Sequence, residues 1–161
     1  MSEIIKVGMA DLKICKSPDG VTTLGLGSCV GIAIRDPLTK IGGLAHIMLP
    51  DSKAIRENSN IPKFADTGIE ELVRQLVAAG ALRVRLVAKI AGGAQMFGAQ
   101  NRNNAVRVGE RNVEAVRAKL LQMRIPILAS DTGLNYGRTV IFYPETGDFV
   151  IKAIGKPEKV I

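Results

Sequence analysis

The chain has 161 residues, a formal net charge of +7, 47% hydrophobic residues, no Trp, two Cys and one His. This length predicts one domain over residues 1–161, and the few Cys and His residues argue against a metal site and against a secreted disulfide scaffold. Because the chain has neither a run of about 18 uncharged apolar residues nor a signal peptide's apolar core, we expect a cytoplasmic protein with free thiols and no membrane insertion.

The first half of the chain predicts four strands and one helix. Short segments rich in Val and Ile predict strands at residues 4–7, 22–26, 30–35 and 41–49, ahead of a long polar loop at 51–62. The helix that follows is amphipathic and stops at Gly80. Its apolar stripe consists of Ile69, Leu72, Val73, Leu76 and Val77.

The second half predicts a strand at 82–90, a second helix and three more strands at 125–129, 139–143 and 149–154. In the strand at 82–90, Arg83 and Arg85 alternate with apolar residues and are expected on a solvated edge or face. The helix follows Gly109, carries Val113, Val116, Leu120 and Met123 on one stripe, and ends before Pro126. Because strands outnumber helices, the pattern favours an α+β layered fold, with a β-sandwich-like core flanked by two main helices.

Two glycine-rich segments look like phosphate-binding turns and fail the tests for them. A dinucleotide-binding fingerprint needs a glycine where Val30 stands, followed by a helix rather than a strand. Neither residues 22–31 nor residues 92–98 contain the Gly-Lys-Ser/Thr ending of a P-loop. We interpret these glycines as leaving room for backbone and ligand around Cys29.

A hairpin register brings Cys29 and His46 together. If residues 36–39 form a four-residue loop, Arg35 faces Lys40 and Cys29 faces His46, at a Cβ separation of about 4.5–5.5 Å. Thr23 has the same strand parity as Cys29. This register leaves one wholly apolar face for the core, made of Val30, Ile32, Ile34, Ile41, Gly43, Ala45 and Ile47.

A neighbouring thiol and imidazole are typical of nucleophilic catalysis, because the imidazole takes the thiol's proton and passes it to the leaving group. A Thr23 hydroxyl can hold the ring in one tautomer, and the backbone N–H groups of Gly27 and Ser28 can bind an oxyanion. The alternatives stay open at this point, since a free Cys is usually a small buried hydrophobe and a lone His on a strand is usually structural. Cys15 has no such setting and is assigned to packing.

The segment Thr23-Leu24-Gly25-Leu26-Gly27-Ser28-Cys29, followed by Ala45-His46-Ile47-Met48-Leu49-Pro50, resembles the signature of the CheD family, the chemoreceptor glutamine deamidases of chemotaxis. The similarity continues through residues 63–67, 91–97, 109–113 and 131–133 and covers nearly the whole chain. One departure is visible, because Leu134 replaces the second Gly of the family's usual Asp-x-Gly-Gly, ahead of Gly137-Arg138. This departure leaves the conformation of the loop open.

The resemblance implies that Cys29 is the nucleophile, His46 the general acid and base, and Thr23 the residue that orients His46. The implied reaction hydrolyses glutamine side-chain amides to glutamate on receptor cytoplasmic helices, through a thioester, with release of ammonia and without a cofactor. The implied fold is similar to the catalytic domain of cytotoxic necrotizing factor. The implied partners are the chemoreceptor cytoplasmic domain and the phosphatase CheC, which inhibits the family.

Three other motifs have competing interpretations. Gly92 and Gly93 either line the site or form a tight turn after a buried strand. Phe64 either contacts substrate or anchors the first helix by burial. Asn112 is interpreted as a capping residue at the start of the second helix.

Two other classes of function remain to be weighed. A non-catalytic interaction module would bind receptors or CheC without turnover. A basic nucleic-acid binder is disfavoured, because aromatic residues are only 4% of the chain and do not interleave with Lys or Arg. The net charge is compatible with acidic receptor helices and does not identify them.

Overall fold

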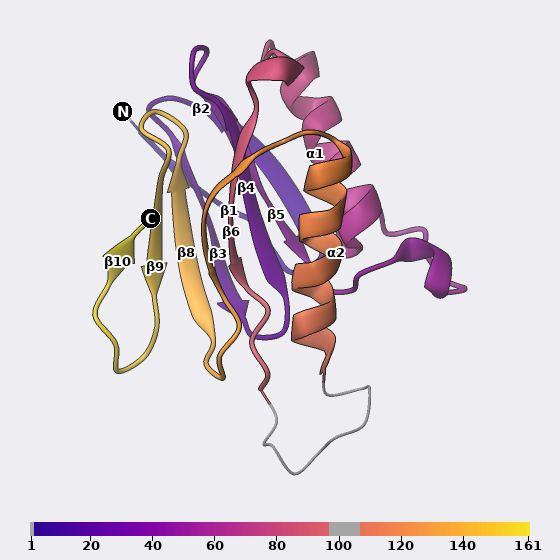
Figure 1. The fold of residues 1–161 in the computed structure, drawn as a ribbon. Coiled ribbons are helices and arrows are strands. Elements are labelled where there is room, and N and C mark those ends of the chain that lie inside the picture. Colours follow the sequence, from indigo (N-terminus) through magenta and orange to yellow (C-terminus); the bar gives the residue numbers. More distant parts are fainter. Residues whose placement is uncertain (1, 97–106) are drawn as a thin grey trace.

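The computed structural model describes residues 2–96 and 107–161, so Phe97, the last residue of the motif at 91–97, lies outside it. The described residues form three layers (Figure 1): two β-sheets face each other, and two helices cover the outer side of one sheet. The predicted α+β layered fold is confirmed. No helix within the described ranges is long and apolar enough to cross a membrane.

Each sheet has five strands. The outer sheet has the order β1-β3-β8-β9-β10, formed by Ile4–Lys6, Gly20–Leu26, Arg138–Tyr143, Asp148–Lys152 and Lys159–Val160. The helix-covered sheet has the order β2-β5-β4-β6-β7, formed by Asp11–Lys16, Ile41–Ile47, Val30–Asp36, Val87–Gly92 and Ile127–Thr132. Strands β2 and β10 were not predicted. Three of the six residues of β2 are charged (Asp11, Lys13 and Lys16), so the segment lacks the apolar run used to predict strands. β10 has only two residues and is too short for a recognisable pattern.

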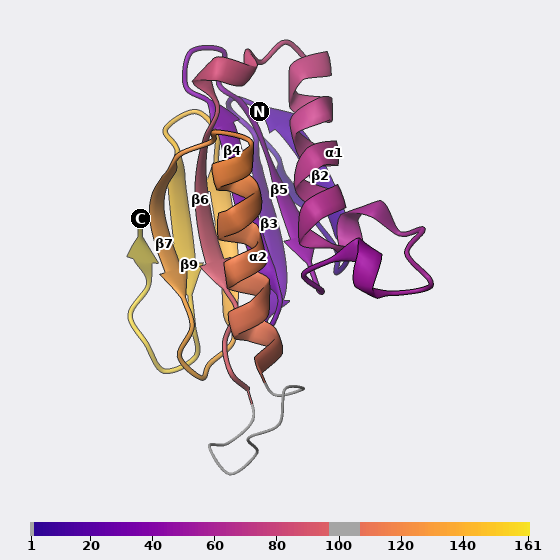
Figure 2. The same ribbon diagram turned by 45° about the vertical axis from the view of Figure 1, so that its right-hand side comes forward.

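The helices α1 (Ala65–Ala78) and α2 (Val108–Gln122) pack side by side on the β4–β5–β6 region, as Figure 2 shows. The predicted stripe of α1 is buried except for Val77, which is 44% exposed, so that assignment was wrong. Gly109 lies inside the first turn of α2 rather than before it. A Cβ at Gly109 would lie 2.3 Å from Ala94 O, so close packing of the helix start, and not helix termination, requires this glycine.

The segment after α1 also differs from its prediction. Arg83–Arg85 forms a 3₁₀ turn, and β6 begins only at Val87. Arg85 does not lie on a sheet face, because its guanidinium bonds both carboxylate oxygens of Asp36 at 2.8 Å. Arg83 is exposed as expected.

The β4–β5 hairpin has a different register from the predicted one. Asp36 pairs with Ile41 and Gly31 with His46, so the loop is Pro37–Lys40 and Cys29 does not oppose His46. Asp36 explains the difference in register. Its buried carboxylate accepts hydrogen bonds from the Leu38 N–H and the Arg85 guanidinium, which holds Asp36 as the last residue of β4 and not as the first residue of the loop. Lys40 closes the loop with a φ of 58°. Moving the loop by one residue shifts the pairing by two, which preserves both faces.

The core is divided by the helix-covered sheet. The helix side holds Val30, Ile32, Ile34, Ile41, Ala45 and Ile47, so the predicted apolar face is confirmed. The side between the sheets holds Cys15, Cys29, Ala33 and Leu44 with apolar residues of the outer sheet. Both cysteines are free and buried in this second layer.

Candidate active site

Thr23 and His46 meet between the two sheets. Thr23 Oγ1 lies 2.7 Å from His46 Nδ1, and the same hydroxyl donates to Val7 O at 2.8 Å. A carbonyl can only accept and the hydroxyl has one proton, so Thr23 must accept from Nδ1–H. The proton of neutral His46 is therefore on Nδ1, which leaves Nε2 with a free lone pair.

His46 is fully buried, and burial lowers the pKa of its imidazole below 6.5. The ring is thus neutral at pH 7 and can accept a proton. Its Nε2 atom is buried and has no hydrogen-bond partner among the residues described. A buried acceptor without a partner is uncommon in folded proteins, and the free lone pair makes this nitrogen able to accept a proton.

Cys29 lies in the bend between β3 and β4, one residue before the first paired residue of β4, and is 8% exposed. Burial raises the pKa of its thiol, and its own backbone N–H opposes this shift. Since Nε2 of His46 is unpartnered, the thiol–imidazole hydrogen bond is not made in this conformation. Catalytic hydrogen bonds are often long without substrate and tighten when it binds.

Gly92 and Gly93 support the backbone of the Cys29 bend. Gly93 N–H donates to Cys29 O at 2.8 Å, and Ala94 N–H donates to Gly27 O at 2.8 Å. Gly92 has a φ of 108°, and a Cβ there would lie 2.3 Å from Cys29 O. These contacts favour the tight-turn interpretation, in which the glycines let two backbones cross directly beneath the thiol.

The two predicted oxyanion donors differ. Gly27 already donates its N–H to Gly25 O at 3.0 Å, which weakens its candidacy. Ser28 is half-buried beside Cys29 and remains the better candidate of the two.

Phe64 lies at the junction between the 3₁₀ turn Ile61–Lys63 and α1, and its ring is fully buried. With no exposed surface it offers no contact to a substrate in this structure, and we interpret it as a hydrophobic anchor of α1.

Asn112 was misread as a helix cap. It is the fifth residue of α2, fully buried, and its Nδ2 donates to Ser28 O and to Met48 O, both at 2.9 Å. Asn112 thus links the segment before the thiol with the segment after the imidazole. The only sequence signal was a polar residue near the apolar stripe of an amphipathic helix, which does not identify its partners.

The loop that carries the family departure lies against the Gly92–Gly93 turn. Gly133 N–H donates to Gly92 O at 3.0 Å, and Gln95 N–H donates to Leu134 O at 2.8 Å. Leu134 has a φ of 59°, a conformation that a glycine adopts without strain and that costs another residue roughly 1–2 kcal/mol. The replacement therefore keeps the loop in a conformation suited to glycine.

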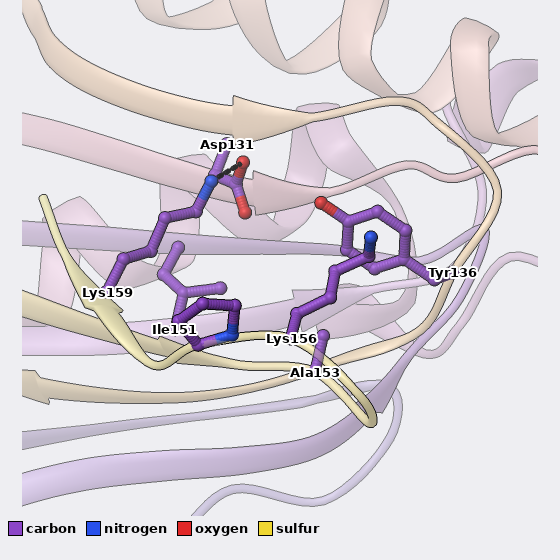
Figure 3. Close-up of a pocket in the computed structure, with 7 residues that line it drawn as sticks. Asp131, Tyr136, Ile151, Ala153, Lys156 and Lys159 are labelled. Atoms are coloured by element: carbon purple, nitrogen blue, oxygen red, sulfur yellow. Dashed lines mark ion pairs between the residues drawn. The ribbon is translucent and has the colours of Figure 1, made fainter.

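Two pockets among the described residues include neither Cys29 nor His46 in their lining. A pocket of about 300 Å³ under β9 and β10 is lined by Asp131, Tyr136, Ile151, Ala153, Lys156, Pro157 and Lys159 (Figure 3), none of which is a predicted site residue. Within it, Lys159 forms an ion pair with Asp131 at 2.8 Å. Another, of about 310 Å³, includes Gly93 but neither Cys29 nor His46. In residues 2–96 and 107–161, no three His, Cys, Asp or Glu side chains gather as metal ligands.

A thiol and an imidazole of fixed tautomer, buried at one end of a β-sandwich, define the class of candidate cysteine hydrolases. A family model described as CheD chemotactic sensory transduction matches residues 48–153. The chain is 63% identical to the "Probable chemoreceptor glutamine deamidase CheD" of Lachnoclostridium phytofermentans, over 100% of both chains. It is 48% identical to the "Chemoreceptor glutamine deamidase CheD" of Halalkalibacterium halodurans, again over 100% of both. The chain belongs to the CheD family.

Among solved structures, the hypothetical protein YfiH of Bacillus licheniformis matches with a TM-score of 0.41 and 17% identity, covering 72% of this chain and 51% of that one. A likeness at this level adds nothing to the assignment. Similarity to cytotoxic necrotizing factor stays a prediction.

Proposed function

We propose that the protein deamidates selected glutamine side chains on the cytoplasmic helices of chemoreceptors, with Cys29 as nucleophile, His46 as general acid and base, and Thr23 as the residue that orients His46. Family membership and the names of full-length relatives support the reaction. The single observation that carries the residue roles is the hydrogen-bonded chain from Val7 O through Thr23 to His46, which leaves Nε2 free in the layer that holds Cys29.

In the first half of the reaction, Nε2 of His46 takes the Cys29 proton and the thiolate attacks the glutamine side-chain carbonyl carbon. The tetrahedral oxyanion collapses as the imidazolium gives its proton to the amide nitrogen, so ammonia leaves and a thioester remains. Throughout, Nδ1–H stays bonded to Thr23, which keeps the ring from turning. Thr23 brings no charge, so it orients the imidazolium without the electrostatic stabilisation that a carboxylate would add.

In the second half, Nε2 removes a proton from water, and the resulting hydroxide attacks the thioester. Collapse of this intermediate breaks the carbon–sulfur bond, and the imidazolium returns its proton to the thiolate. The product is a glutamate side chain, and Cys29 and His46 are restored to their starting protonation states. All steps use one thiol, one imidazole and water, so the proposal includes no cofactor.

The closed geometry around the thiol is compatible with a substrate that arrives on another macromolecule. Cys29 exposes 8% of its surface and lines neither of the pockets described above. A glutamine presented on a helix can reach such a recessed thiol with its own side chain. We further propose that the protein acts in the cytoplasm and that CheC is a second partner.

Mass spectrometry of a receptor cytoplasmic fragment, before and after incubation with the protein, tests the proposal. Wild-type protein and Cys15→Ala should convert specific glutamines to glutamate, and Cys29→Ala should not. Conversion by Cys29→Ala would overturn the role of Cys29. Binding to receptor or CheC without conversion by the wild type would favour the non-catalytic module instead.

A further inference from the structure

The pairing between β4 and β5 includes His46, which pairs with Gly31, and stops before Cys29. The last paired residues are Val30 and Ile47, so Cys29 lies one residue beyond the end of the ladder. After this point the two chains diverge, because Met48 donates its N–H to Lys63 O at 2.8 Å and not to the β4 side. Direct backbone hydrogen bonds therefore do not fix the distance between the Cys29 bend and the chain that follows His46.

The side chain of Asn112 fills this gap. Its amide group donates to Ser28 O and to Met48 O, both at 2.9 Å. Both acceptors are carbonyls, which determines that the nitrogen, and not the oxygen, faces them. Since Asn112 is fully buried, water does not compete for these bonds, and they hold the two segments at a defined separation.

The other amide atom shows that packing alone does not explain this residue. Asn112 Oδ1 is buried and has no partner in the described part of the chain. An unpaired buried carbonyl destabilises a protein, whereas an apolar residue of similar shape would avoid that cost. Asn112 makes two donor hydrogen bonds although its side-chain oxygen stays without a partner. We take this as an indication that the bonds to Ser28 and Met48 are the reason for an asparagine at this position.

We propose that Asn112 is a positioning residue that replaces the missing ladder and sets the separation between the Cys29 thiol and the His46 imidazole. Ser28 immediately precedes the thiol, and Met48 follows Ile47, the last paired residue of β5, so the two bonds join the segments that leave the ladder on either side of the pair. This inference rests on the proposed function in that both use Cys29 and His46 as reacting groups.

The test compares Asn112→Leu with Val116→Ala. Asn112→Leu keeps a similar shape and removes both donors, and Asn112→Asp serves as a second variant that turns the donor into an acceptor. Val116→Ala is a matched control, because Val116 is a fully buried residue of the same helix with its contacts in the helix-side core. Each variant is assayed well below its own melting temperature, so that loss of folding does not enter the rates.

With a receptor fragment as substrate, Asn112→Leu should lower kcat by about 100-fold with KM changed by less than about threefold, since small displacements of reacting groups act on the chemical step. Val116→Ala should keep kcat within about twofold of wild type despite its lower stability. A folded Asn112→Leu protein with wild-type kcat, or a loss of kcat in Val116→Ala as large as in Asn112→Leu, would overturn the proposal.

A second readout needs no receptor. In a Cys15→Ala background, the rate of Cys29 alkylation by iodoacetamide is measured against pH, with and without His46→Gln. His46→Gln should slow alkylation when Asn112 is present, because the imidazole takes the thiol proton when the two groups approach each other. It should have no further effect in Asn112→Leu, in which the separation of the two segments is no longer fixed. An equal His46 effect in both backgrounds, or none in either, contradicts the positioning role. If wild-type protein shows no deamidation, the proposed function fails, and the alkylation series still decides the role of Asn112.

Discussion

The two ends of the β4–β5 hairpin bury their ionisable side chains, Asp36 and His46, in opposite ways. At the turn, the fully buried carboxylate of Asp36 accepts two bonds from Arg85 and one each from the backbone N–H groups of Leu82 and Leu38. At the open end, His46 Nε2 and Asn112 Oδ1 are also buried, and neither has a partner in the residues described. A buried carboxylate with a full set of donors stabilises the fold, whereas an unpartnered imidazole nitrogen keeps its capacity to accept a proton.

The protonation states at the two ends have different causes. At the turn, hydrogen bonds from Arg85 hold the pKa of Asp36 far below its ordinary 3.8, against the effect of burial. At the open end, burial alone lowers the pKa of His46, and no charge counteracts it. Hence the turn keeps a charge and the open end keeps a neutral base. The difference predicts that substitutions at the turn change stability, and that those at the open end change catalysis.

The largest effect on activity is expected from His46→Gln, which removes the imidazole from the open end of the hairpin without adding a charge. Deamidation of a receptor fragment should fall by about a thousandfold in kcat/KM, because general acid and base catalysis is lost. The free energy of unfolding should change little in comparison. Since His46 is the only histidine, no second imidazole can restore activity. Retention of more than a tenth of wild-type activity would contradict the assigned role.

Asp36→Asn tests the turn. Removing the charge from this buried ion pair should lower the free energy of unfolding by about 3 kcal/mol, while kcat of the folded protein stays within about twofold. Denaturant unfolding measures the first quantity and receptor deamidation the second. Arg74→Gln is the matched control, because its ion pair with Glu71 leaves Arg74 67% exposed, and such pairs contribute about 0–1 kcal/mol.

The pH dependence of stability sharpens the same test. Because the pKa of folded Asp36 lies below its ordinary 3.8, the stabilisation is fully present above pH 3.8 and is lost as the pH falls below it. In Asp36→Asn this part of the acid dependence should disappear. An unchanged acid profile in the variant would assign the acid sensitivity to other carboxylates.

Thr23→Val should have a smaller effect at the open end. The valine keeps the shape of threonine and removes the acceptor for Nδ1–H, so the ring can turn or change tautomer. We expect kcat to fall by about 10- to 100-fold, less than for loss of the imidazole itself. Thr23→Ser keeps a hydroxyl and should retain most of the activity. A loss in the serine variant as large as in the valine variant would show that the hydroxyl alone does not account for the role of Thr23.

The smallest expected effect is a displacement of the acid limb of the pH–activity profile. As the pH falls through the pKa of folded His46, the imidazole gains a proton and can no longer act as a base. Because burial lowers this pKa, the acid limb of kcat/KM should lie below pH 6.5. Measurement between pH 5 and 8 in constant ionic strength decides this point, and an acid limb above pH 6.5 would contradict a buried, neutral His46 as the base.

Features that depend on local periodicity could be predicted from the sequence. The apolar stripes place Ile69 and Leu72 of α1 and Val116 and Leu120 of α2 in the core, as found. The faces of β4 and β5 were also correct, because side-chain parity survives a shift of two residues. Thr23 was also placed on the side of His46, but strand parity does not explain this result, because the register shifts between Thr23 and Leu26.

Features that depend on distant partners could not be predicted. The hairpin register is fixed by Asp36, whose partner Arg85 is 49 residues away and was assigned to a strand. The hydrogen bonds of Asn112 reach Ser28, which is 84 positions away in the chain, and Met48, which is 64 positions away. Hydrogen bonds between residues so far apart do not produce a periodic pattern in the sequence, so they cannot be predicted from the residue pattern alone.

The position of Val7 has a practical consequence for preparing the protein. β1 runs parallel to β3, and Val7 O accepts the hydrogen bond from the Thr23 hydroxyl that fixes the His46 tautomer. If an affinity tag or a truncation displaces β1, the Thr23 hydroxyl is free to donate to Nδ1, and the imidazole proton can then occupy Nε2. Such a preparation would keep Cys29, His46 and Thr23 and still lack a base facing the thiol, so fusion at the carboxyl end is the safer choice for kinetic work.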